Sequence, residues 1–246
     1  MSKRLEEIDW QPTPLGPISL RRRLEPSLQV DIYEVKLGDE FLMSSLFPVA
    51  EIELARLGLA AVTGDGLDVL VGGLGLGYTA ATALEDDRVA SVSVIEALAP
   101  VISWHDRRLL PDTATLSTDP RTALVQGDFF ALSRGSAGFG LGLPERFHAV
   151  LLDIDHTPQH VLHPSHAAFY SGDGLRQLAS QLHPGGVFAL WSDDPPDADF
   201  TALLGEVFAS AEAHLVTFAN PLTGGTSSNT VYVATTTLQS GDRPNA

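Results

Sequence analysis

Four carboxylates able to do chemistry follow three short apolar runs of the sequence. Glu96 follows the first run, Asp128 the second, and Asp153 and Asp155 the third. Open α/β sheets bind ligands at the carboxyl ends of their parallel strands, so these acids are expected to meet at one edge. Carboxylates there can accept hydrogen bonds from sugar hydroxyls or amines and can take a proton from a nucleophile. Any one of them alone could be a solvated strand-end residue; three successive strands ending this way predict a site.

A glycine-rich turn precedes these acids. The apolar run 67–71 leads into Gly73, Gly75 and Gly77, a strand-to-helix turn in which backbone can approach a ligand. The spacing is G-x-G-x-G, and Tyr78 stands where a dinucleotide-binding loop has its third glycine, which disfavours a nicotinamide-dependent dehydrogenase. Glu96 follows Gly77 by nineteen residues, a position from which an acid can bind ribose hydroxyls.

The elements that must position these residues alternate between strand and helix. Short apolar runs followed by amphipathic segments predict a parallel sheet. Two further β-rich runs, 214–218 and 230–235, are joined by a Gly/Ser/Asn-rich segment that is typical of a hairpin. Little regular structure is expected over 1–16. We therefore expect three segments: an N-terminal β-rich unit over 1–47, a Rossmann-like domain over 48–238 and a polar tail over 239–246.

Composition excludes several classes of function. The 15 Lys and Arg against 31 Asp and Glu give a net charge of −16, which repels nucleic acid and anionic membranes. The absence of cysteine excludes disulfides and thiolate chemistry. Since no apolar run reaches the length of a membrane helix and no signal peptide is evident, a cytoplasmic protein without nucleic-acid or membrane partners is predicted.

Four motifs together resemble a known family. They are VLVGGLGLG, VSVIEAL, the Asp119-Pro-Arg turn before Gly127-Asp128, and HAVLLDID. They are similar to the class I S-adenosylmethionine-dependent methyltransferase superfamily, and within it to spermidine synthase-like (polyamine aminopropyltransferase-like) proteins, over about 28–236. The resemblance implies an α/β, class I methyltransferase-like (Rossmann-like) seven-stranded sheet with a C-terminal antiparallel hairpin and a small N-terminal β unit. It also implies a homodimer.

The resemblance assigns roles to the residues at the predicted edge. Glu96 would hold the ribose hydroxyls, Asp128 and Phe129 the adenine, and the glycine loop from Gly73 to Gly77 the methionine part of S-adenosylmethionine or its decarboxylated form.

Asp153 and Asp155 are the catalytic candidates at the end of the fourth strand of this sheet. Either residue could be the base that takes a proton from the nucleophile, or could bind a cationic acceptor. Asp153 could also contact the cofactor. One of the two is expected to be only a cap or a solvated residue.

Two departures from the resemblance bear on the reaction. The family's loop resembles GGGDGG and its fourth-strand motif D-S-S-D-P, whereas this chain has Leu76 at the place of the loop Asp and reads Asp153-Ile-Asp-His156. An Asp beside the donor's own carboxylate would repel it and select the decarboxylated donor, which Leu does not do. The sequence thus predicts an S-adenosylmethionine-dependent transferase, with methyl transfer to a small acceptor ahead of aminopropyl transfer. A catalytically degenerate nucleoside-binding scaffold is the third alternative.

Four histidines lie between His156 and His166, but Pro158 and Pro164 prevent a continuous helix through them. We expect a substrate-facing lid or a polar loop and no metal. The acidic stretch from Asp193 to Asp199 could attract a cation, although a solvated loop explains it equally well.

Overall fold

The computed structural model describes residues 5–135, 139–140 and 142–238, so the predicted tail over 239–246 lies outside the described residues. The chain begins with a four-stranded antiparallel sheet of order β1-β2-β3-β4. Its strands are β1 (Leu5–Gln11), β2 (Ile18–Glu25), β3 (Val30–Leu37) and β4 (Glu40–Ser44).

The expectation of little regular structure over 1–16 is wrong for residues 5–11, which form β1. This strand lies at the sheet's edge, and Glu6 and Glu7 on it pair with Arg22 and Arg21 of β2. An edge strand with mostly polar, partly exposed side chains lacks the apolar alternation that reveals a strand in a sequence.

The larger sheet has seven strands in the order β11-β12-β10-β9-β5-β6-β7. The five strands β10, β9, β5, β6 and β7 are parallel, and β12 joins them antiparallel through its hairpin with β11. This confirms the predicted seven-stranded α/β fold with its C-terminal hairpin. The strands are β5 (Leu67–Gly72), β6 (Val89–Glu96), β7 (Thr122–Gln126), β9 (Phe147–Leu152), β10 (Leu182–Ser192), β11 (Ser210–Asn220) and β12 (Gly225–Thr235).

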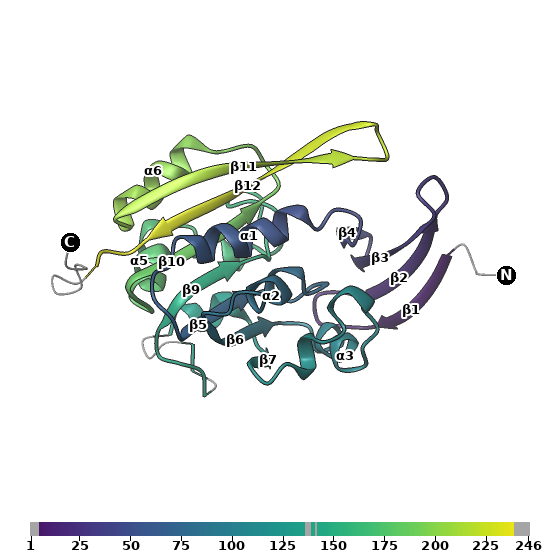
Figure 1. Cartoon of the computed structure of the whole chain (residues 1–246), viewed down its shortest axis with the longest axis horizontal. Coiled ribbons are helices and arrows are strands. Elements are labelled where there is room, and N and C mark those ends of the chain that lie inside the picture. Colours follow the sequence, from purple (N-terminus) through teal and green to yellow (C-terminus); the bar gives the residue numbers. More distant parts are fainter. Residues whose placement is uncertain (1–4, 136–138, 141, 239–246) are drawn as a thin grey trace.

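Helices cover both faces of this sheet (Figure 1). In β5, Val69 and Val71 belong to one core cluster and Leu70 to the other, as the twofold alternation of a strand requires. The first cluster includes residues of α1 (Val49–Ala60), α2 (Tyr78–Ala83) and α3 (Ala99–Asp106). The second includes residues of α4 (Phe129–Ser133), α5 (Gly172–Ala179) and α6 (Ala198–Val207).

The N-terminal sheet stands beyond the carboxyl ends of the central strands (Figure 1). It is attached there by polar and apolar contacts: the Trp104 indole donates a 2.7 Å hydrogen bond to Asp9 of β1, and Ile18 and Leu20 of β2 are part of the first core cluster. Short 3-10 turns occur at Pro111–Thr113, Leu116–Thr118 and Pro164–His166. Within the described ranges, the helices are all too short or too polar to cross a membrane.

Candidate active site

A cavity of about 1070 Å³ lies where the carboxyl ends of the central strands face the N-terminal sheet. Residues from both sheets line it, together with residues of α1 and of the loop after β9. Among the described residues that line it, six are carboxylates and none is Lys or Arg. The six acids are Glu40, Glu51, Glu96, Asp128, Asp153 and Asp193. An unneutralised acidic cavity of this size favours a ligand that carries positive charge.

The glycine loop contributes bare backbone to this cavity through Gly73 and Gly75, which both line it. Gly73 has φ +92°, and a Cβ there would overlap the Asp153 carbonyl oxygen; Gly75 has φ +46°, and a Cβ there would lie 2.5 Å from Met43 of β4. Gly77 also has a positive φ but does not line the cavity: a Cβ there would meet the buried His105 ring. Two of the three predicted glycines therefore line the cavity, and the third makes room for the His105 side chain.

Glu96 lines the cavity from the end of β6. One carboxylate oxygen accepts a hydrogen bond from the Leu74 N–H at 3.0 Å and the other from the Leu98 N–H at 2.8 Å. Burial raises the pKa of Glu96, although the backbone N–H groups that it accepts from oppose this by favouring the ionised form. The carboxylate thus holds the loop after β5 against the loop after β6, and its contact with a ribose stays a prediction.

Asp128 and Phe129 follow β7 and both line the cavity. The Asp128 carboxylate caps α4 by accepting the Ala131 N–H at 3.0 Å. Phe129 is buried, with Phe130 and Phe169 edge-on to it at 5.5 and 5.7 Å between ring centroids. The cluster fixes an aromatic wall at this end of the cavity, next to an exposed carboxylate.

Asp153 faces the cavity from the end of β9 and lies beside a second carboxylate that sequence reasoning missed. Its Oδ2 accepts a 2.9 Å hydrogen bond from Thr79, whose hydroxyl also lies 3.3 Å from the carbonyl oxygen of Glu51 in α1. Burial and the neighbouring Asp153 charge raise the pKa of Glu51 to about 8, and burial raises the pKa of Asp153 as well. No described Lys or Arg of the cavity lining neutralises this pair.

A signal for Glu51 was present in the sequence. Leu54, Ala55 and Gly58, three, four and seven residues further along α1, are buried on the helix face that packs on the sheet. An acid at that spacing on an apolar face is either paired or functional, because burying an unpaired charge is costly.

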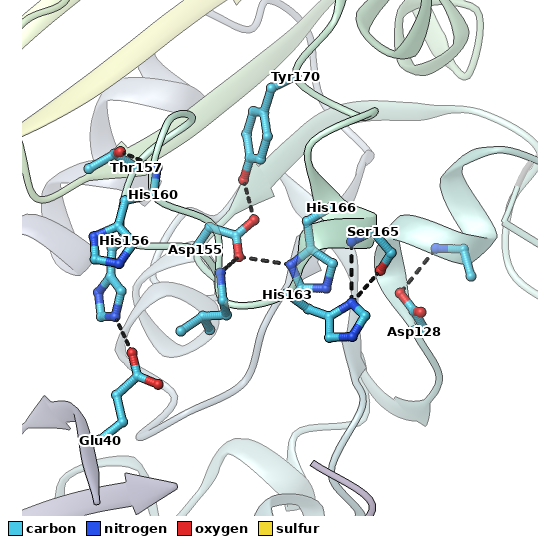
Figure 2. A network of polar contacts seen from close by, with 12 residues as sticks. Glu40, Asp128, Asp155, His156, Thr157, His160, His163, Ser165, His166 and Tyr170 are labelled. Atoms are coloured by element: carbon cyan, nitrogen blue, oxygen red, sulfur yellow. Dashed lines mark hydrogen bonds and ion pairs between the residues drawn. The ribbon is translucent and has the colours of Figure 1, made fainter.

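Asp155 lies outside the cavity lining. It is 1% exposed and accepts three hydrogen bonds: from the Leu162 N–H at 2.7 Å, the His166 Nδ1 at 2.8 Å and the Tyr170 hydroxyl at 2.9 Å (Figure 2). Neither a solvated residue nor a base in contact with substrate fits this geometry. Asp155 instead anchors the histidine-containing loop, which brings the adjacent residue His156 to the cavity.

The loop residue used to favour methyl transfer, Leu76, does not face the cavity. Its side chain is 3% exposed within the core, its carbonyl accepts from the Thr113 hydroxyl at 2.8 Å, and its N–H points to the Met43 sulfur. Leu76 therefore cannot discriminate between donors through contact with them. The preference for methyl transfer that was inferred from Leu76 loses its basis. The acids with contacts at the glycine loop are Glu96, which accepts from the Leu74 N–H, and Asp153, whose carbonyl lies against Gly73.

The histidines between 156 and 166 form separate contacts. His156 bonds Glu40, His163 bonds Ser165 and His166 bonds Asp155 (Figure 2). In the described part of the chain, no group of three or more His, Asp or Glu side chains is arranged to hold a metal ion.

Comparisons with known proteins identify the fold. Neither a family model nor a curated protein matches the sequence. Two similar solved structures are a spermidine synthase in complex with the transition state analogue AdoDATO and the spermidine synthase from Thermotoga maritima. The first has a TM-score of 0.71 and 16% identity over 95% of this chain and 74% of that chain. The second has a TM-score of 0.69 and 16% identity over 95% and 73%.

The strand order and the cavity at the strand ends define a class I methyltransferase-like sheet. More narrowly, the chain has the spermidine synthase-like form of this fold, with the N-terminal sheet included.

Proposed function

We propose that this protein transfers an aminopropyl group from decarboxylated S-adenosylmethionine to an amine. The observation that carries the proposal is the charge of the cavity: six carboxylates and no Lys or Arg among the described lining residues. Decarboxylated S-adenosylmethionine carries a sulfonium and an ammonium, and an amine acceptor adds a further cation. An acidic, partly enclosed site attracts such ligands.

The Glu51 and Asp153 pair supports the decarboxylated donor over S-adenosylmethionine itself. Asp153 lies against Gly73, and the Glu51 carbonyl contacts the Thr79 hydroxyl at the start of the helix that follows the loop; the donor's tail would rest here. A tail that ends in an ammonium alone favours ionisation of this pair and gains a counterion, whereas a tail with a carboxylate adds a further negative charge beside two acids that burial already makes hard to ionise, with no described Lys or Arg of the lining to offset it. Like charges brought together in a desolvated site cost several kcal/mol. Methyl transfer from S-adenosylmethionine lacks this support.

The residues of the cavity fit such a donor. Glu96 would hold the ribose, and Asp128 and Phe129 would contact the adenine. The aminopropyl tail of the donor would lie against the backbone of Gly73 and Gly75. Asp153 and Glu51 would bind the ammonium at the end of that tail. When bound, the sulfonium supplies an electrophilic carbon, so the chain's own task is to orient the nucleophile and to take its proton. The structural neighbour solved with AdoDATO supports this placement as a likeness of fold.

Binding measurements test the donor. We expect decarboxylated S-adenosylmethionine to raise the melting temperature more than methylthioadenosine, which lacks both the sulfonium and the ammonium charge. S-adenosylmethionine should raise it least. At equal concentrations the ligand with the lower Kd stabilises the folded protein more. Mass spectrometry of mixtures with diamines and polyamines would then detect an aminopropylated product. Tighter binding of S-adenosylmethionine than of its decarboxylated form would refute the proposal.

A further inference from the structure

The histidine beside the buried anchor Asp155 lies at the other end of the cavity from the aromatic wall. His156 lines the cavity, and its backbone carbonyl accepts the Asp193 N–H at 2.7 Å. The Asp193 carboxylate in turn accepts from the Asn229 side chain at 2.7 Å. The loop after β9 is thus fixed to Asp193, just after β10, and through it to Asn229 within β12, so the His156 backbone has a defined place.

A carboxylate from the N-terminal sheet orients the His156 ring. Glu40 of β4 places Oε1 2.9 Å from His156 Nε2 (Figure 2). An ionised carboxylate only accepts hydrogen bonds, so the ring donates through Nε2. In the neutral ring Nδ1 is then the nitrogen with a free lone pair, ready to accept a proton. Glu40 comes from the N-terminal sheet and His156 from the loop after β9, and both line the cavity.

A second histidine with a fixed ring, His166, lies at another part of the cavity. His166 is held by Asp155 through Nδ1, and its ring stacks on Phe130 with 3.9 Å between centroids, at the end assigned above to the adenine. His160 stands 5.2 Å from the His156 ring but is exposed and does not line the cavity. His163 also lines the cavity, but its ring lies 5.8 Å from that of His166 and bonds Ser165, so it belongs to the same end as His166. This leaves His156 for the acceptor end, where Glu40, His160 and Asp193 are the titratable groups around it.

An amine acceptor arrives at neutral pH as an ammonium, which has no lone pair and cannot attack. We propose that His156 accepts this proton through Nδ1 and that Glu40 is the positioning residue that holds its ring, an inference that rests on the proposed aminopropyl transfer. The ammonium N–H bond breaks and the imidazole becomes an imidazolium. The freed nitrogen then attacks the carbon next to the sulfonium, a C–N bond forms, and the C–S electron pair returns to sulfur as a neutral thioether. The imidazolium releases its proton to solvent.

The test compares His156→Ala and His156→Gln with a matched control. His214 on β11 also faces a glutamate, Glu212, at 3.4 Å, but it does not line the cavity, so His214→Ala removes a histidine of the same type of pair. A proton acceptor contributes about 10²–10⁴-fold to a rate, so both His156 variants should lose about that factor in kcat. Binding of methylthioadenosine should stay within about twofold, and His214→Ala should behave as the wild type.

Two readouts separate a proton acceptor from a merely structural residue. Added imidazole should restore part of the turnover of His156→Ala and none in His156→Gln, where the cavity is filled. In a plot of log kcat against pH, the wild type should fall on the acidic side with a slope that corresponds to one proton. The plot for His156→Ala should lack this acidic decrease. Glu40→Gln should lower kcat about tenfold while imidazole leaves it unchanged, since the ring is still present.

The outcomes distinguish the two proposals. If the wild type transfers the aminopropyl group and the His156 variants keep full kcat, or show neither rescue nor an altered pH profile, the role of His156 is refuted and the proposed function stands. If the wild type transfers no aminopropyl group from the decarboxylated donor to any diamine or polyamine, both are refuted.

Discussion

The most direct physical test of the cavity is the substitution Glu51→Gln. The raised pKa of Glu51 means that the folded state binds its proton more tightly than the unfolded chain does. The contribution of Glu51 to stability is therefore fully present below the ordinary pKa of 4.5 and is lost as the pH rises through about 8. Gln keeps the shape and cannot ionise, so the variant should not suffer this loss.

The size of the effect follows from the two pKa values. A tenfold change in the acid dissociation constant is worth about 1.4 kcal/mol, so raising the pKa from 4.5 to about 8 corresponds to about 5 kcal/mol. In a domain of this size each kcal/mol moves the melting temperature by about 2–4 °C. Glu51→Gln should thus melt about 10 °C or more above the wild type at pH 9, and close to it at pH 5.

Thermal unfolding of the ligand-free protein at both pH values measures this difference. Glu53→Gln is the control, because Glu53 is on the same helix but pairs with Arg56 at 3.2 Å at the surface. At pH 7, the same substitution should weaken binding of decarboxylated S-adenosylmethionine and reduce the proton release that accompanies it. An identical pH dependence of melting in wild type and Glu51→Gln would show that Glu51 is not a buried, uncompensated acid, and the argument from cavity charge would fail with it.

Three further substitutions test the rest of the site. Gly73→Ala should destabilise the fold by about 2 kcal/mol or more in urea unfolding, since the left-handed backbone costs about 1–2 kcal/mol and the added Cβ overlaps the Asp153 carbonyl. Asp153→Asn should weaken donor binding and turnover together, measured by calorimetry and by product formation, because the donor's ammonium loses a counterion. Asp155→Asn should cost about 1.5–3 kcal/mol in urea unfolding, because it weakens charged hydrogen bonds from His166 and Tyr170.

Much of the fold was predictable because strand and helix leave different periodicities in the sequence. The apolar runs that become β5, β6 and β9 are buried on both faces, and their ends carry Glu96 and Asp153 to the cavity as the topology of a parallel sheet dictates. The different roles of residues next to each other in the sequence were harder to predict. Asp155 and His156 differ by one position, yet one is a buried anchor and the other faces the cavity, and only the path of the loop decides which.

The charge of the site shows why a motif position is a poor guide to donor choice. By the resemblance, Leu76 is expected at the place of the family's loop acid, but its side chain is buried in the core. The acid that stands beside Asp153 comes from α1, and a third, Glu40, comes from β4. A ligand responds to the field summed over all groups around it and not to the segment that supplies each one. Selection against a donor carboxylate therefore needs no acid in the glycine loop, because Glu51 and Asp153 line the cavity as one interacting pair.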